Sequence, residues 1–118
     1  MEYKIAEGEN KLAELVWEHE PMTSMELVRL CEQKLEWKKS TTFTVLKKLC
    51  NKGILQNKNS LVTSLVPREE FVREKSRRFV EDTFGGSLPG FIAAFMGKEK
   101  LSNEEIEELR RMIDNYKE

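Results

Sequence analysis

Residues 37–68 read WKKSTTFTVLKKLCNKGILQNKNSLVTSLVPR, and they contain the strongest structural pattern in the chain. The first part predicts a helix over residues 40–52, with Gly53 as its C-cap. The side chains at inward-facing helical spacing are Thr42, Val45, Leu46 and Leu49. The opposite side is polar and basic, so we expect one face of this helix to be packed and the other to be exposed.

The second part of the segment predicts a β-hairpin. Residues 54–57 and 61–66 are rich in apolar and β-branched side chains, and Lys58-Asn59-Ser60 between them is a plausible turn. Pro67 ends the second strand. We therefore expect two short antiparallel strands directly after the helix.

Two helices are predicted ahead of this segment. Residues 8–19 place apolar side chains at helical spacing, and Pro21 ends that helix. Thr23 and Glu26 have the spacing of a capping box, which would start a second helix. Three helices followed by a hairpin are the plan of a winged helix-turn-helix, so we assign residues 1–69 to a DNA-binding domain of this class.

The charge of the same segment is uneven. Residues 37–68 hold seven lysine or arginine side chains and no carboxylate, whereas the whole chain has a net charge of −1. A segment that keeps its bases and lacks acids is suited to facing an anion, and nucleic acid is the commonest such partner. A basic surface without a ligand is the alternative interpretation of charge alone.

The outward face of the predicted third helix supplies the candidate contacts to double-stranded DNA. Ser40 and Thr44 are small enough to let a helix approach base edges in the major groove. Lysines would meet phosphates, which position a protein without selecting sequence. Phe43 would contact a thymine methyl group or pack on the preceding helix, and both interpretations remain open. The candidate DNA-binding residues are Lys39, Ser40, Thr41, Phe43, Thr44, Lys47, Lys48 and Lys58.

The C-terminal part, residues 70–118, predicts a helical dimerisation domain. Helices are expected from Arg68 to about Phe84, over residues 88–96, and after the capping-box sequence at Ser102. Their apolar side chains exceed what three short helices can bury among themselves. The candidate dimer-interface residues are Phe79, Phe84, Leu88, Phe91, Phe95, Ile106, Leu109, Ile113 and Tyr116. The alternative is a self-contained helical subdomain.

Several classes of protein do not fit this composition. The longest apolar run, residues 91–96, is far shorter than the roughly 18 residues of a membrane span, and no secretory signal is visible. Cys31 and Cys50 lack metal or redox spacing, which predicts reduced, packed thiols. His19 is the single histidine. We therefore expect a cytoplasmic protein without metal, cofactor or enzymatic activity.

Three segments together match a known family. They are IAEGE at residues 5–9 with Trp17 after it, the helix-to-strand segment at residues 37–55, and Leu101-Ser102 followed by Glu-Glu-Ile at residues 104–106. In these segments the chain resembles the BlaI/MecI/CopY family of penicillinase-type transcriptional repressors, over nearly its whole length. The resemblance implies a homodimeric winged-helix repressor that binds a palindromic operator.

The resemblance also implies how the repressor is released from DNA. At several positions, however, this chain differs from the family. In the penicillinase branch a membrane-sensor signal leads to cleavage of the repressor in its dimer arm, which implies a sensor-linked protease as a partner. By position the cleaved bond would be Ala94–Phe95, where the family has asparagine before the cut and this chain has alanine. Lys38 and Lys39 replace a serine and a proline, so Ser40 becomes the expected helix cap. No cysteine follows Cys50, which argues against copper sensing.

A second function remains open from the sequence. The predicted wing is one residue shorter than in the family, and Ser60-Leu61 stands where a glycine-arginine pair is usual. Weaker DNA contacts by the wing are therefore expected. A winged-helix module that binds another protein, without binding DNA, is the alternative to a repressor.

Overall fold

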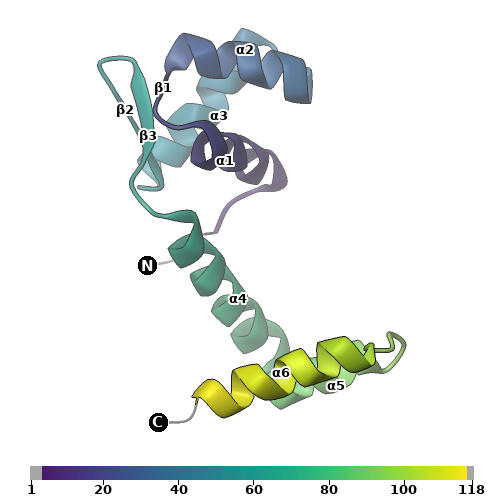
Figure 1. The fold of residues 1–118 in the computed structure, drawn as a ribbon. Coiled ribbons are helices and arrows are strands. Elements are labelled where there is room, and N and C mark those ends of the chain that lie inside the picture. Colours follow the sequence, from purple (N-terminus) through teal and green to yellow (C-terminus); the bar gives the residue numbers. More distant parts are fainter. Residues whose placement is uncertain (1–3, 117–118) are drawn as a thin grey trace. The chain divides into compact units, whose positions relative to one another are not determined.

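The computed structural model describes residues 4–116 (Figure 1). Its elements in chain order are α1 (Glu7–His19), β1 (Met22–Thr23), α2 (Ser24–Leu35), α3 (Lys39–Asn51), β2 (Leu55–Lys58), β3 (Leu61–Ser64), α4 (Arg68–Phe84), α5 (Leu88–Met96) and α6 (Asn103–Tyr116). Three helices precede a hairpin and more helices follow it. The predicted fold class, a winged helix-turn-helix followed by a helical region, is confirmed.

Helices α2 and α6 start at the capping boxes that the sequence predicts. The Thr23 hydroxyl accepts from the Glu26 amide, and the Glu26 carboxylate accepts from the Thr23 amide, both at 3.1 Å. Ser102 and Glu105 repeat this arrangement ahead of α6, at 3.1 and 3.0 Å. Ser87 caps α5 by accepting from the Gly90 amide. Each cap satisfies amides that the first turn of a helix leaves without a partner.

The sheet has three antiparallel strands in the order β1-β3-β2. Lys58 pairs with Leu61, which leaves Asn59 and Ser60 as a two-residue turn, and both have positive φ. This conformation is that of a type I′ turn, whose twist matches that of the strands. The predicted hairpin is confirmed with strands shifted or shortened by one or two residues, but the sequence did not predict β1.

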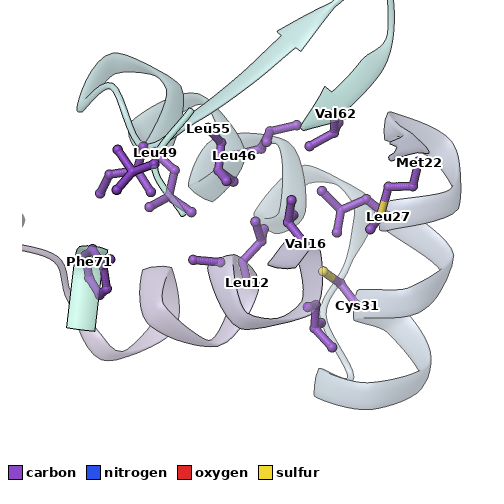
Figure 2. Packing of buried hydrophobic residues seen from close by; sticks show 14 residues of the cluster. Leu12, Val16, Met22, Leu27, Cys31, Leu46, Leu49, Leu55, Val62 and Phe71 are labelled. Atoms are coloured by element: carbon purple, nitrogen blue, oxygen red, sulfur yellow. The ribbon is translucent and has the colours of Figure 1, made fainter. Parts of the chain in front are cut away.

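The core of the first unit, Met1–Ser76, joins all three N-terminal helices to the sheet. Figure 2 shows its packing, with side chains from α1, α2, α3, both long strands and the start of α4. The labelled apolar side chains are Leu12, Val16, Met22, Leu27, Cys31, Leu46, Leu49, Leu55, Val62 and Phe71. All of them are buried, so burial of apolar surface stabilises this arrangement.

Two aromatic contacts attach the start of α4 to this core. The Trp17 indole Nε1 donates to the Val66 carbonyl at 2.9 Å, and its ring lies 5.2 Å from the Phe71 ring between centroids. Phe71 is itself buried. The first two turns of α4 therefore belong to the first unit, and the division between units falls after Ser76, seven residues beyond the predicted domain boundary.

The second unit, Arg77–Glu118, is organised around phenylalanines. The rings of Phe79, Phe84 and Phe91 lie within 5.6–6.0 Å of one another between centroids, and Phe95 lies 6.3 Å from Phe91. Helices α5 and α6 line a common groove. No side chain of α5 or α6 in the described residues is fully buried. Taken alone, this unit has a thin core.

Candidate nucleic-acid interface

Helix α3 has one packed face and one exposed face, as predicted. Thr42, Leu46 and Leu49 are buried, and Val45 is half-buried. The exposed residues on the other sides of the helix are Lys39, Ser40, Thr41, Thr44, Lys47, Lys48 and Asn51. Because an α-helix repeats every 3.6 residues, the leucines hold the helix against α1 and α2 while Thr44 and Lys47 point outward.

The seven basic residues of the segment divide into two groups. Lys52 and Arg68 form ion pairs with carboxylates of α1. In the described part of the chain the other five, all exposed, form no ion pair with any carboxylate: Lys38, Lys39, Lys47, Lys48 and Lys58. This group of five is called the lysine face below. Of the five, Lys48 is near enough to Glu9 to help lower the pKa of that carboxyl, although it forms no ion pair with it. Positive charge that is not held in ion pairs attracts polyanions.

Lys52 has a structural role. Its Nζ lies 2.9 Å from each oxygen of Glu9 and 3.1 Å from the Lys4 carbonyl. The Glu9 side chain is only 8% exposed. Burial by itself raises the pKa of Glu9, but the hydrogen bond from the Ala6 amide and the Lys52 ammonium outweigh it, so the pKa lies below its usual value. Lys52 therefore ties the end of α3 to the start of α1.

Arg68 makes the second tie. Its Nε donates to both oxygens of Glu14 at 3.0 and 2.9 Å, and this contact raises the pKa of the guanidinium further. Both side chains lie at the surface, where one ion pair adds little stability. The contact joins the first residue of α4 to α1, and it withdraws Arg68 from the set of bases available to a ligand.

The start of α3 differs from the expectation. Ser40 was expected to cap the helix, but α3 begins at Lys39 and its N-cap is Lys38, which makes no side-chain cap hydrogen bond. Ser40 lies inside the first turn, and its carbonyl accepts from the Thr44 hydroxyl at 2.9 Å. The reason is that Lys38 already has the extended backbone of a cap residue, with φ −75° and ψ 157°. The first turn contains lysine and no acid, which suits an anion at this end of the helix.

Phe43 is half-buried and packs against the core. It also lines a hollow between α3 and the wing, together with Leu46 and Leu55. The structure therefore shows Phe43 packed against the core, while a contact with α2 stays a prediction. A contact between its ring and DNA remains a prediction.

The wing places one candidate at its tip. Lys58 is the last residue of β2 and precedes the turn at Asn59 and Ser60. Gln56 donates to the Thr63 hydroxyl across the strands at 3.0 Å, which orders the outer surface of the hairpin. Sequence reasoning left Lys38 out of the candidate list, although it belongs to the lysine face. Its position in the acid-free segment was the signal that could have included it.

A model of the penicillinase repressor family matches residues 5–115. The chain belongs to this family. Its members are transcriptional repressors, and the resemblance noted in the sequence is confirmed.

Individual relatives in the penicillinase repressor family align with almost the full length of this chain. The penicillinase repressor of Bacillus licheniformis is 24% identical over 118 residues, with 97% of this chain and 92% of the relative covered. The methicillin resistance regulatory protein MecI of Staphylococcus aureus (strain N315) is 25% identical, with 95% and 94% covered. The penicillinase repressor of Staphylococcus aureus is 22% identical, with 95% and 92% covered.

In this penicillinase repressor family member the predicted dimer residues fall into two groups. Phe84, Phe91, Ile106 and Leu109 are half-buried within the second unit. The exposed group is Phe79, Leu88, Phe95, Ile113 and Tyr116. Exposure reaches 51% for Phe79, 62% for Ile113 and 88% for Tyr116. Large apolar side chains left this open are typical of a surface that a partner covers.

The remaining groups in the described residues that could form a site are the histidine, cysteine and carboxylate side chains. No group of three or more histidine, cysteine, aspartate or glutamate side chains there is placed to hold a metal ion. Cys31 and Cys50 are free thiols, and burial raises the pKa of each. Among the helices of residues 4–116, none combines the length and apolarity needed to cross a bilayer.

Proposed function

We propose that this protein is a homodimeric transcriptional repressor that binds a palindromic operator through α3 and the wing, in the cytoplasm where its DNA target lies. The observation that carries the proposal is the lysine face. Five exposed lysines without ion pairs surround a helix whose small outward side chains allow a close approach to base edges. Membership of a family of repressors supports the same conclusion.

The side chains of α3 divide by role. Lys47, Lys48 and Lys58 would contact phosphates, and the uncapped start of α3 offers a further phosphate site close to Lys39. Thr44 would read a base. Its hydroxyl donates to the Ser40 carbonyl, which leaves an acceptor lone pair and a methyl group facing outward. An acceptor fits an amino group of adenine or cytosine, and a methyl group fits that of thymine.

Dimerisation would occur through the exposed apolar side chains of the second unit. Phe79, Leu88, Phe95, Ile113 and Tyr116 are open to solvent in a single chain. A two-fold pair of chains would present two α3 helices to two half-sites of a palindrome, with their centres about 34–36 Å or a multiple of that distance apart. Two half-sites engaged together would bind far more tightly than one.

Proteolysis in the arm would release the repressor. Ala94 and Phe95 lie in the last turns of α5, and both are exposed. Cleavage between them would break the covalent link between Phe91 and Phe95, whose rings are in contact, and would separate six of the eight residues that line the groove between α5 and α6 from Phe91 and Ile92. A protease needs an extended substrate, so this turn would have to open locally first. The partner would be a protease linked to a sensor.

The test is binding of the full-length protein to its own upstream DNA, measured by fluorescence anisotropy at several salt concentrations. Three lysines from each of two protomers give six phosphate contacts, so we expect the logarithm of affinity to fall with the logarithm of salt with a slope of roughly −5. Footprinting should show two half-sites related by a two-fold axis. No binding at low salt would reject the repressor and favour the protein-interaction module.

A further inference from the structure

A hollow of about 510 Å³ lies between α3 and the wing, and no role has been assigned to it so far. Its floor is made by Leu46 and Leu55, which belong to the core. Its sides are made by Phe43, Cys50 and Leu65. Leu65 is 52% exposed, although it lines the same hollow as the buried core residues Leu46 and Leu55. The hollow is open to solvent, since four of its eight lining residues are exposed, namely Lys47, Gln56, Asn57 and Leu65.

The rim of the hollow is polar and carries a single charge. Lys47, Gln56 and Asn57 complete the lining, and all three are exposed. The Gln56 amide nitrogen is engaged with Thr63, which orients that side chain. No carboxylate lines the hollow, and Lys47 has no ion pair with any described residue. An apolar floor beneath one unpaired cation is complementary to a molecule that has an apolar body and an anionic end.

Cys50 adds apolar surface and no reactivity. Burial raises the pKa of its thiol, and a hydrogen bond from the Asn57 backbone amide opposes this only in part. A thiol with a raised pKa is protonated near neutral pH and is a weak nucleophile. The hollow is therefore suited to reversible binding.

We propose that this hollow binds a small amphipathic organic anion, an aromatic or short aliphatic carboxylate, and that its binding lowers the affinity of the protein for DNA. The hydrocarbon part would lie on Leu46 and Leu55, and the carboxylate would accept from the Lys47 ammonium. An inorganic anion would leave the apolar floor exposed, and a neutral apolar molecule would leave Lys47 without a partner. Only the amphipathic anion satisfies both parts of the lining.

The effect on DNA rests on the proposed function. A carboxylate bound to Lys47 would neutralise the charge that attracts a phosphate, so the bound anion would cost one phosphate contact in each protomer. The same ligand would also bring negative charge toward the DNA backbone. Because both effects oppose DNA binding, the anion would act as an inducer.

Direct binding is tested first, without DNA. trans-Cinnamate is titrated into the full-length, isotope-labelled protein at constant ionic strength, and backbone amide shifts are followed by NMR. We expect saturable shifts centred on Leu55, Gln56 and Cys50. Cinnamamide, which lacks the charge, should bind about two- to fivefold more weakly, because an ion pair with an exposed lysine contributes modestly. Acetate, which lacks the ring, should bind at least about tenfold more weakly, because it leaves the apolar floor uncovered. Equal binding of cinnamamide, or no saturable shift, would overturn the proposal.

Two neighbouring lysines supply a matched pair of variants. Lys47 lines the hollow and Lys48 does not, although both are exposed on α3. Lys47→Gln should weaken cinnamate binding about two- to fivefold, and Lys48→Gln should leave it unchanged. Cys50→Met, which adds bulk inside the hollow, should abolish cinnamate binding while its affinity for DNA stays near that of the wild type. Equal loss in both lysine variants, or loss of DNA binding in Cys50→Met, would contradict the assignment.

The last measurement separates this proposal from the proposed function. Saturating cinnamate should lower the affinity of the wild type for operator DNA and reduce the salt slope by roughly two, which corresponds to two phosphate contacts per dimer. In Cys50→Met it should change neither quantity. Cinnamate that binds the hollow while DNA affinity stays constant would overturn the inducer role alone. A protein that never binds DNA would reject the repressor and leave the ligand site to be judged from the NMR titration.

Discussion

Two lysines near the end of α3 show how surroundings decide the role of a residue. Lys47 is exposed without an ion pair, whereas Lys52 contacts both oxygens of the buried Glu9. We predict that Lys47→Ala weakens binding to all DNA sequences about equally and lowers the salt slope by about two for a dimer. The measurement is anisotropy with operator and random DNA over a range of salt.

Lys52→Ala is the matched control. It should leave the salt slope unchanged and reduce the free energy of unfolding by about 1–3 kcal/mol, because it removes a charge-assisted hydrogen bond. Urea unfolding measures that change. If Lys52→Ala altered DNA binding as strongly as Lys47→Ala did, the division of the basic residues into two groups would be wrong.

Thr44 is expected to act on selectivity. Its hydroxyl donates to Ser40 within the helix, so its outward acceptor and methyl group are held in one orientation. Thr44→Ala should cost about 1–3 kcal/mol of discrimination at one base pair of each half-site, with little effect on random DNA. Competition assays with single-base operator variants measure this. Equal losses of affinity for operator and random DNA would mean that Thr44 contacts the DNA backbone and not a base.

The pair formed by Glu9 and Lys52 predicts a dependence of stability on pH. The pKa of Glu9 is lowered in the folded protein, so its contribution is fully present above the unfolded value near 4.5 and is lost as pH falls through the folded pKa. Glu9→Gln should lower the free energy of unfolding by about 1–3 kcal/mol at pH 7. The two proteins should converge once the pH lies below the folded pKa of Glu9. A difference that persisted at low pH would mean that packing, and not charge, is responsible.

Among the elements, the hairpin carries the clearest backbone strain. Ser60 adopts φ +65°, a region that costs an L-residue about 1–2 kcal/mol relative to glycine. Its carbonyl accepts from the Ser24 amide, so the turn is also held from outside. Ser60→Gly should raise the free energy of unfolding by about 0.5–1 kcal/mol once the added flexibility of the unfolded chain is deducted.

The control for that change is a serine in a helix. Ser76 is exposed within α4, and Ser76→Gly should lower the free energy of unfolding by about 0.5–1 kcal/mol. Thermal unfolding of both variants gives the comparison. A destabilised Ser60→Gly would show that the serine side chain stabilises the turn by more than its positive φ costs.

Most elements were predictable because their signals are local. Each of two capping boxes, Thr23 with Glu26 and Ser102 with Glu105, has its two residues three positions apart and predicts the start of a helix. The hydrogen bonds confirm both. Strand β1 was not predictable in this way. It has two residues, and it exists because Met22 lies opposite Val62, 40 positions along the chain. Nothing within its own window distinguishes it from a loop.

At the scale of the whole molecule, the core is confined to the first unit. In the described residues every buried apolar side chain lies between Leu12 and Phe71. Truncation after Gly86 should therefore leave a folded protein that is mainly monomeric and binds operator DNA at least about a hundredfold more weakly, because the second half-site is no longer linked. Analytical ultracentrifugation and anisotropy measure the two effects. An unchanged sedimentation mass would remove the second unit from the dimer interface.

The sequence by itself determined the order of the elements and which side of α3 is apolar. Periodicity and caps act over a few residues, and the lack of acids in residues 37–68 needs no fold to be seen. Only the tertiary structure decided which bases remain available. Lys52 and Arg68 meet Glu9 and Glu14 across 43 and 54 positions, and Phe43 turns partly into a hollow formed with the wing. Pairing of this kind depends on distances between elements, which the order of residues along the chain does not contain.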